Sequence, residues 1–122
     1  MPDSTKLLVV DDDHMMLEFT ERAVISLGYS CVTAEDAASA LRRLEEDRDI
    51  RILIIDMRLG KGPTGTQLAH QALAIRPGIG VILTSGDPGS LKIAAQEMPQ
   101  DVGLLPKPYR RRDLADRLAS IL

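Results

Sequence analysis

Acidic side chains gather where two short apolar runs of this sequence end. Asp11, Asp12 and Asp13 follow four apolar residues, and Asp56 closes a second, nearly continuous apolar run. Three adjacent carboxylates in a partly dry site repel one another, and each resists losing its water. The triplet therefore indicates either a solvated helix start or a place where a positive charge belongs.

Hydroxyl and amine groups follow two further apolar runs. Thr84 and Ser85 come after the run 79–83, and Lys107 comes after 102–105. Taken singly, these residues are typical of helix caps, turns and solvated surface. Taken together, they supply oxygen ligands suited to Mg²⁺, a second positive charge and hydrogen-bond donors around one carboxylate. Such groups are the components of phosphoryl transfer onto that carboxylate.

The elements that must position these groups alternate along the chain. We expect strands at 6–10, 29–33, 51–55, 79–83 and 102–105. Each is followed by a segment with helical spacing of apolar residues. Five strand–helix repeats predict an α/β fold with a parallel, doubly wound sheet. In such a sheet, sites form beyond the carboxyl ends of the strands, which is where the acidic, hydroxyl and amine groups fall.

Helix boundaries and buried faces can also be predicted. A first helix over 14–27 ends at Gly28, and a later one starts at Asp87-Pro88. The spacings Thr33–Asp36 and Thr64–Gln67 fit capping boxes. The residues expected to face the sheet are Met16, Phe19, Ala23 and Leu27; Ala37, Ala40, Leu41 and Leu44; Leu68, Ala72 and Ile75; Leu91, Ala95 and Met98; and Leu114, Leu118 and Ile121.

Composition narrows the class of protein. The chain has 122 residues, 44% of them hydrophobic, which suits one domain with an aliphatic core. A net charge of −3 disfavours a dedicated nucleic-acid binder, and the basic cluster 110–112 reads as a solvated helix start. Cys31 is the only cysteine, so neither an internal disulfide nor a cysteine-based zinc site can form. No apolar run approaches the ~20 residues of a membrane span, and we expect a cytoplasmic protein.

Four motifs, "VVDDD", "LIIDMRLG", "ILTSG" and "LPKPY", occur in that order along the chain. With them the sequence resembles a response-regulator receiver domain, the phosphoacceptor module of two-component signalling and phosphorelays. The resemblance covers essentially 1–122, with a core from about residue 5, and no output domain is expected. It implies a single five-stranded parallel sheet in the order 2-1-3-4-5 with five helices.

The resemblance implies a role for each matching residue. Phosphorylation by a histidine kinase or a histidine phosphotransfer protein would make the domain a conformational switch for a downstream protein. Self-phosphotransfer and autodephosphorylation would be its only enzymatic activities, and a homodimer is one assembly to consider. The implied assignments are Mg²⁺ held by Asp11, Asp12, Asp56 and the backbone carbonyl of Arg58; Asp56 as the phosphoacceptor; and Thr84 and Lys107 as the groups that contact the phosphoryl oxygens.

Several positions refine or depart from the family pattern. Asp13 falls outside the acidic pair and is expected to cap a helix, and the Lys107–Pro108 bond is expected to be cis. The loop after Asp56 is one residue longer than the commonest form, with Gly60 where Pro is frequent. Leu104 stands where many relatives carry an aromatic residue that changes rotamer, so we expect the signal to travel through 85–98.

Two other functions fit parts of the pattern. "DDDH" after an apolar strand also fits the start of haloacid-dehalogenase-type phosphatases, with Asp11 as nucleophile and Asp13 as acid, but Asp56 would then have no role. A receiver-like interaction module that is never phosphorylated is the second alternative. The complete set of aspartates, threonine and lysine argues against it.

Overall fold

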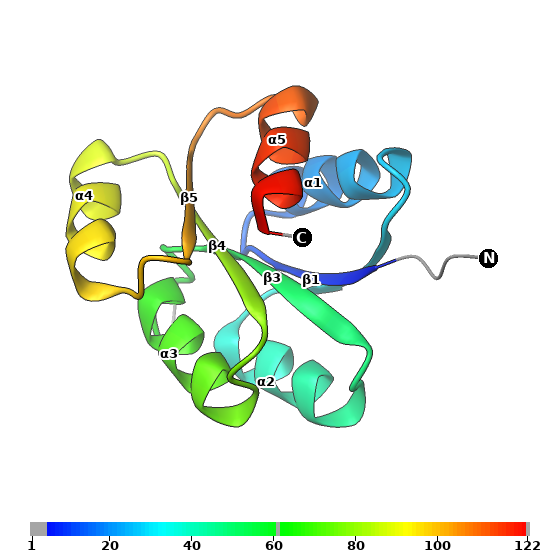
Figure 1. Cartoon of the computed structure of the whole chain (residues 1–122), viewed down its shortest axis with the longest axis horizontal. Coiled ribbons are helices and arrows are strands. Elements are labelled where there is room, and N and C mark those ends of the chain that lie inside the picture. The colour runs from blue at the N-terminus through cyan, green and yellow to red at the C-terminus, as the bar shows by residue number, and fades with distance from the viewer. Residues whose placement is uncertain (1–4, 61, 122) are drawn as a thin grey trace.

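The computed structural model describes residues 5–60 and 62–121, which form five strands and five helices in strict alternation (Figure 1). The elements are β1 Lys6–Val10, α1 His14–Ser26, β2 Ser30–Ala34, α2 Ala37–Glu46, β3 Ile50–Asp56, α3 Gly65–Ile75, β4 Gly80–Ser85, α4 Pro88–Glu97, β5 Gly103–Pro106 and α5 Arg111–Ile121. All five predicted strands are present, with ends that differ by two residues at most.

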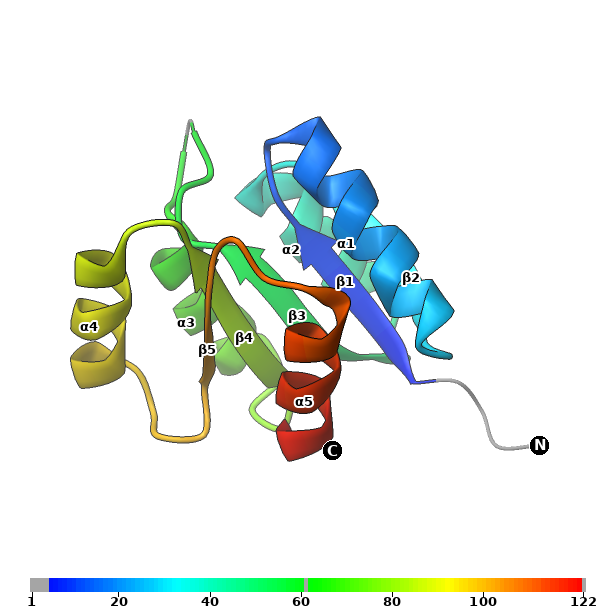
Figure 2. The ribbon, with the colours of Figure 1, turned by 90° about the horizontal axis from the view of Figure 1, so that it is seen from above.

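The sheet has the order β2-β1-β3-β4-β5, and all four neighbouring pairs run parallel. This confirms the predicted topology. Helices α1 and α5 cover one face, while α2, α3 and α4 cover the other (Figure 1). Figure 2 shows the loops after β1, β3 and β5 at one end of the sheet, and the end of α5 with the turns before β4 and β5 at the opposite end. We call these ends the carboxyl edge and the amino edge.

The strands read as apolar runs because both faces of the sheet are buried. In β3, Ile52 and Ile54 pack under α1 and α5, while Leu53 and Ile55 pack under α2, α3 and α4. Each such side chain contributes about 1.5–3 kcal/mol by leaving water. Two aliphatic cores therefore fix the strands, and the strands fix the residues at their ends.

Helix starts mostly follow the predicted chemistry. Thr64 and Gln67 form the expected capping box, and Asp87 caps α4 ahead of Pro88. The capping box predicted between positions 33 and 36 is wrong. Asp36 alone caps α2, accepting a hydrogen bond from Ser39 N at 2.8 Å, because residue 33 already lies within β2.

The buried face of α1 differs from the predicted one. Phe19 is 43% exposed, whereas Thr20 is buried and its hydroxyl hydrogen bonds to the Tyr109 hydroxyl at 2.6 Å. The predicted set of residues and the buried set both repeat with the helical period. Because the buried set contains the polar residue Thr20, its face of the helix resembled the solvent-exposed one. The buried residues of α1 are Leu17, Thr20, Ala23 and Val24.

Smaller corrections concern α3 and α4. Ile75, at the end of α3, is half exposed, and Ala95 is exposed while Ala94 is buried. The spacing 91, 94, 98 has the same helical period as 91, 95, 98, so periodicity alone could not choose between them. Within the part of the chain that the structure describes, none of the helices combines the length and apolar character needed to cross a bilayer.

Candidate functional site

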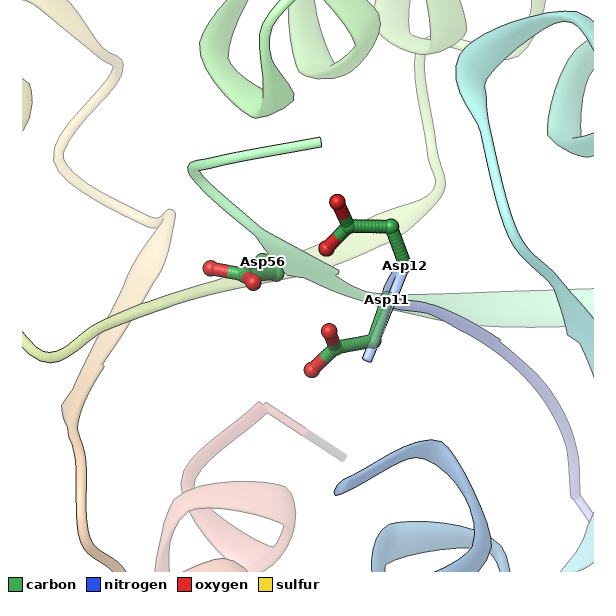
Figure 3. A group of neighbouring side chains, drawn as sticks. All are labelled: Asp11, Asp12 and Asp56. Carbon is green, nitrogen blue, oxygen red and sulfur yellow. The ribbon is translucent and has the colours of Figure 1, made fainter. Parts of the chain in front are cut away.

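Three carboxylates meet at the carboxyl edge of the sheet. Asp11 and Asp12 follow β1, and Asp56 is the last residue of β3, the strand paired with β1. One carboxylate oxygen from each lies within 4.8 Å of those of the other two. Figure 3 shows the three carboxylates directed to the same side of the ribbon. The side chains that the sequence predicted to converge are therefore close together.

Lys107 brings the positive charge that the sequence led us to expect. Its Nζ lies 3.1 Å from Asp11 Oδ2 and 3.2 Å from Asp56 Oδ2. The lysine follows β5, and its backbone N–H donates to the Ser85 carbonyl at 2.8 Å, which extends the pairing of β4 with β5. The Lys107–Pro108 bond is cis, as expected. The ammonium group of Lys107, which follows the edge strand β5, therefore contacts the carboxylates of Asp11 and Asp56 near the centre of the sheet.

Burial sets the electrostatics of this cluster. Asp11 and Asp56 are only 4% and 8% exposed. Burial raises the pKa of Asp11, with a further increase from Asp56, although a hydrogen bond from Asp13 N–H and the nearby Lys107 oppose the shift. For Lys107, burial lowers the pKa, but attraction by Asp11 and Asp56 outweighs it and the pKa is raised. The site favours added positive charge.

Further polar groups lie next to Asp56. Thr84 is the residue opposite Asp56 in the pairing of β3 with β4, and it is buried. The Thr84 carbonyl accepts a hydrogen bond from Met57 N at 2.9 Å, and Arg58 N–H donates to Asp56 Oδ1 at 3.2 Å. A cavity of about 570 Å³ opens beside Asp56 and Lys107, bordered by Thr66 of α3 and by loop residues. The carboxylate is therefore reachable from outside.

Two glycines allow loops to approach the acids closely, and only one of them stood out in the sequence. A Cβ on Gly65 would lie 2.3 Å from the Asp56 carbonyl oxygen, so α3 can begin there only with glycine. A Cβ on Gly60 would lie 2.8 Å from Asp12 Oδ2, and this glycine has φ +70°. Proline cannot adopt that angle, which explains the departure from the commoner family form. Gly65 could have been noticed as the glycine that follows the Thr64 cap.

Asp13 and Tyr109 support the site from outside. Asp13 caps α1 as predicted, with its side chain accepting from Met15 N and Met16 N. Tyr109, two residues after Lys107, is buried and linked to Thr20 of α1 by their hydroxyls, a contact that the sequence analysis missed. The segment after β5 that contains Lys107 is therefore connected by a hydrogen bond to α1, the helix that follows Asp11 and Asp12.

A parallel sheet in the order 2-1-3-4-5, flanked by five helices and bearing an acidic cluster at its carboxyl edge, defines a flavodoxin-like α/β domain. The family model described as "Response regulator receiver domain" matches residues 7–119. The chain therefore belongs to the receiver domains of response regulators, the signalling switches of two-component systems.

Relatives agree with this assignment. The "Response regulator receiver protein CpdR" of Brucella abortus is 27% identical over 117 residues, covering 96% of each chain. The "Transcriptional regulatory protein GlrR" of Escherichia coli is 36% identical over 103 residues, which are 84% of this chain and 22% of that protein. This chain thus spans less than a quarter of GlrR, and 51% of the response regulator MprA of Mycobacterium bovis.

Solved structures show the same fold. A response regulator receiver domain protein from Clostridium thermocellum has a TM-score of 0.85 at 28% identity, covering 96% of this chain and 94% of that one. A response regulator receiver protein from Sinorhizobium medicae has a TM-score of 0.88 at 23% identity, covering 97% and 94%. Receiver domains bind Mg²⁺ through an acidic cluster and take their phosphoryl group from histidine kinases or phosphotransfer proteins.

Proposed function

We propose that this domain accepts a phosphoryl group on Asp56 from a phosphohistidine of a histidine kinase or phosphotransfer protein. The observation that carries the proposal is the position of the Asp56 carboxylate. It lies among two other carboxylates, 3.2 Å from an ammonium, and beside an open cavity. The domain would act as a cytoplasmic switch that is read by a downstream protein.

The acidic cluster suits Mg²⁺. Its ligands are carboxylate oxygens, the hard donors that this ion prefers, and they are close enough to share one ion. We propose Asp11, Asp12 and Asp56 as ligands, together with the backbone carbonyl of Arg58. Bound Mg²⁺ would supply positive charge that offsets both the repulsion among the acids and the charge on a phosphoryl group.

The chemistry follows from Asp56 as nucleophile. A carboxylate oxygen attacks the phosphorus in line, the bond from phosphorus to the histidine nitrogen breaks, and the imidazole leaves with the electron pair and gains a proton. The product is an acyl phosphate. Lys107 moves from Asp56 to the new phosphoryl oxygens, and the Thr84 hydroxyl donates to one of them. Attack of water on phosphorus later restores the carboxylate and releases phosphate.

A protein donor needs a docking surface near the acids, and α1 offers one. Met15 is 84% exposed and Phe19 is 43% exposed, although both are large and apolar. They border a shallow hollow of about 460 Å³, together with Arg22 and Arg111. Because α1 starts three residues after Asp11, a partner on this hollow would reach the cavity beside Asp56.

The test is phosphorylation by acetyl phosphate with Mg²⁺, followed by intact mass. The wild type should gain one phosphoryl group, and Asp56→Asn should gain none. Asp13→Asn is the matched control, because Asp13 caps α1 and lies outside the cluster, and it should be labelled like the wild type. Equal labelling of Asp56→Asn and the wild type would reject Asp56 as acceptor.

The same experiment separates the alternatives. A receiver-like module that is never phosphorylated would show no labelling of the wild type by acetyl phosphate or by any donor. A haloacid-dehalogenase-type phosphatase would turn over a phosphate monoester steadily and would need Asp13 free as an acid. In the structure the Asp13 carboxylate is engaged by two backbone N–H groups, which argues against that role.

A further inference from the structure

A second hollow lies at the amino edge of the sheet, away from the acids. It has a volume of about 840 Å³ and is formed by the starts of β3, β4 and β5 and the ends of α3 and α5. Figure 2 shows these segments together at the edge opposite the loops after β1, β3 and β5. Four arginines line it: Arg48, Arg51, Arg76 and Arg117. Nothing in the proposed phosphorylation uses this hollow.

One of the arginines is held in place by hydrogen bonds, and another packs over the start of β5. The Arg76 guanidinium donates to the carbonyls of Leu44 and Ile50 at 2.5 and 2.9 Å, and to a third carbonyl at 3.3 Å. The Arg117 side chain packs over Gly103, where a Cβ would lie 3.2 Å from Arg117 Cδ. The glycine at the start of β5 therefore leaves room for the Arg117 side chain beside the hollow, and Arg76 is fixed at its edge.

The charge of the hollow is not balanced by its own residues. Asp101 is the one carboxylate among the described residues that line it. Within residues 5–60 and 62–121, no carboxylate forms an ion pair with Arg48, Arg51 or Arg117, and the nearby Asp47 is paired with Lys6. The ends of α3 and α5 add roughly half a negative charge each. The unpaired guanidinium groups leave the hollow positively charged, which suits a phosphate group.

The rest of the lining combines apolar side chains with the polar residues Gln100 and Ser120. Half-buried Leu73, Val102 and Ile121 face the hollow together with Pro77. Small-molecule sites commonly measure about 300–1,000 Å³ and combine apolar walls with a few fixed polar groups. Guanidinium groups bind phosphate oxygens in pairs and stack on flat rings. We propose that this hollow binds a small molecule of nucleotide size, with its phosphate or diphosphate held by Arg48, Arg51 and Arg117 and its base against the apolar wall.

The test is titration with a fluorescent N-methylanthraniloyl derivative of ADP in buffer containing EDTA, which removes divalent ions from the acidic cluster. Saturable binding below millimolar concentration is expected. Arg51→Ala and Arg117→Ala should each weaken it at least about tenfold, since each removes a charged hydrogen-bonding group. Arg112→Ala is the matched control on α5 because Arg112 does not line the hollow, and it should bind like the wild type.

Competition identifies the part of the ligand that is recognised. Inorganic pyrophosphate should displace the probe, and added salt should weaken binding, because the phosphate supplies most of the attraction. Asp56→Asn should bind the probe like the wild type, so failure of the proposed phosphorylation would not affect this result. No saturable binding by the wild type, or binding by Arg51→Ala and Arg117→Ala as tight as that of the wild type, would overturn the proposal. Binding of a short polyglutamate peptide in preference to ADP would also overturn it, in favour of an acidic protein partner.

Discussion

The two edges of the sheet carry opposite charges and are built in different ways. At the carboxyl edge, short acids lie at strand ends or just after them; Asp11 and Asp56 are almost wholly buried, Asp12 is exposed, and a lysine lies within 3.2 Å of the two buried acids. At the amino edge, long arginines reach in from a loop, a strand, the end of α3 and helix α5. Short side chains on strands can move little when a neighbouring residue is substituted, whereas long side chains can change conformation. We therefore expect substitutions at the carboxyl edge to destabilise the fold more than substitutions at the amino edge.

The largest expected difference is at the glycines of the two edges. Gly65→Ala should lower the free energy of unfolding by about 3 kcal/mol, because the new methyl group meets the backbone at Asp56 and neither can move aside. Gly103→Ala should cost about 1 kcal/mol or less, since the flexible Arg117 side chain can shift. Gly78→Ala meets nothing within 4 Å and serves as control. Chemical denaturation measures all three, and an equal loss for Gly65→Ala and Gly103→Ala would contradict the contrast.

Mg²⁺ should stabilise the folded domain by binding at the carboxyl edge and not at the amino edge. At tenfold above its dissociation constant, Mg²⁺ should raise the free energy of unfolding by about 1.4 kcal/mol, because it binds the folded acids. Asp12→Ala should lose most of this gain, and Arg51→Ala should keep it. Melting is followed by circular dichroism, since the chain has no tryptophan. An unchanged melting temperature of the wild type in millimolar Mg²⁺ would count against the metal site.

The link between Thr20 and Tyr109 predicts a smaller effect with a pH signature. Burial raises the pKa of Tyr109 above its usual 10.0, with Lys107 opposing the shift. The folded state then keeps a proton that the unfolded state releases, so stability falls as pH rises through 10. Tyr109→Phe should cost about 1 kcal/mol at neutral pH and reduce that alkaline decline.

Thr20→Val is the control for the tyrosine. It also breaks the hydrogen bond, but it leaves Tyr109 to titrate, so the alkaline decline should persist. The raised pKa of Lys107 contributes a loss in the same direction above 10.5, and this part should remain in both variants. Identical pH profiles for Tyr109→Phe and the wild type would remove tyrosine as a source of the decline.

The smallest effect is expected in the response to a phosphoryl mimic. Beryllium fluoride with Mg²⁺ should shift the backbone amide signals of 85–98 most, since Leu104 lacks the ring that would carry a change to β5 and beyond. Signals of α5 should shift less, and those of Gly103 and Arg117 at the amino edge least. Shifts at the amino edge as large as those in 85–98 would show that the two edges are coupled.

The residues of the carboxyl edge could be predicted from the sequence because the parallel strand order alone determines that they lie together. Once the strands were recognised, parallel order placed Asp11, Asp56 and Lys107 at one edge. The roles of these residues in phosphorylation stay predictions, as does the carbonyl of Arg58 as a ligand. The faces of α1 and α4 were less predictable, because two stripes shared the helical period and the buried Thr20 is polar.

The amino edge could not be predicted. Four arginines are scattered along the sequence, on predicted loops, a strand start and a helix: Arg48, Arg51, Arg76 and Arg117. Only the packing of α3 and α5 against the sheet brings them together. Gly65 was missed for a similar reason. It begins α3, and the contact that demands glycine is with the backbone at Asp56, at the end of β3.

The separation of 96 positions between Asp11 and Lys107 has a consequence for synthesis of the protein. The ribosome makes the acidic pair first, then Asp56, and adds the lysine that bridges Asp11 and Asp56 only after all five strands have been translated. A nascent chain that lacks β5 holds the acids without their internal cation. Such a chain lacks the ion pairs of Lys107 with Asp11 and Asp56, so the proposed acceptor site is completed only at the end of translation of the sheet.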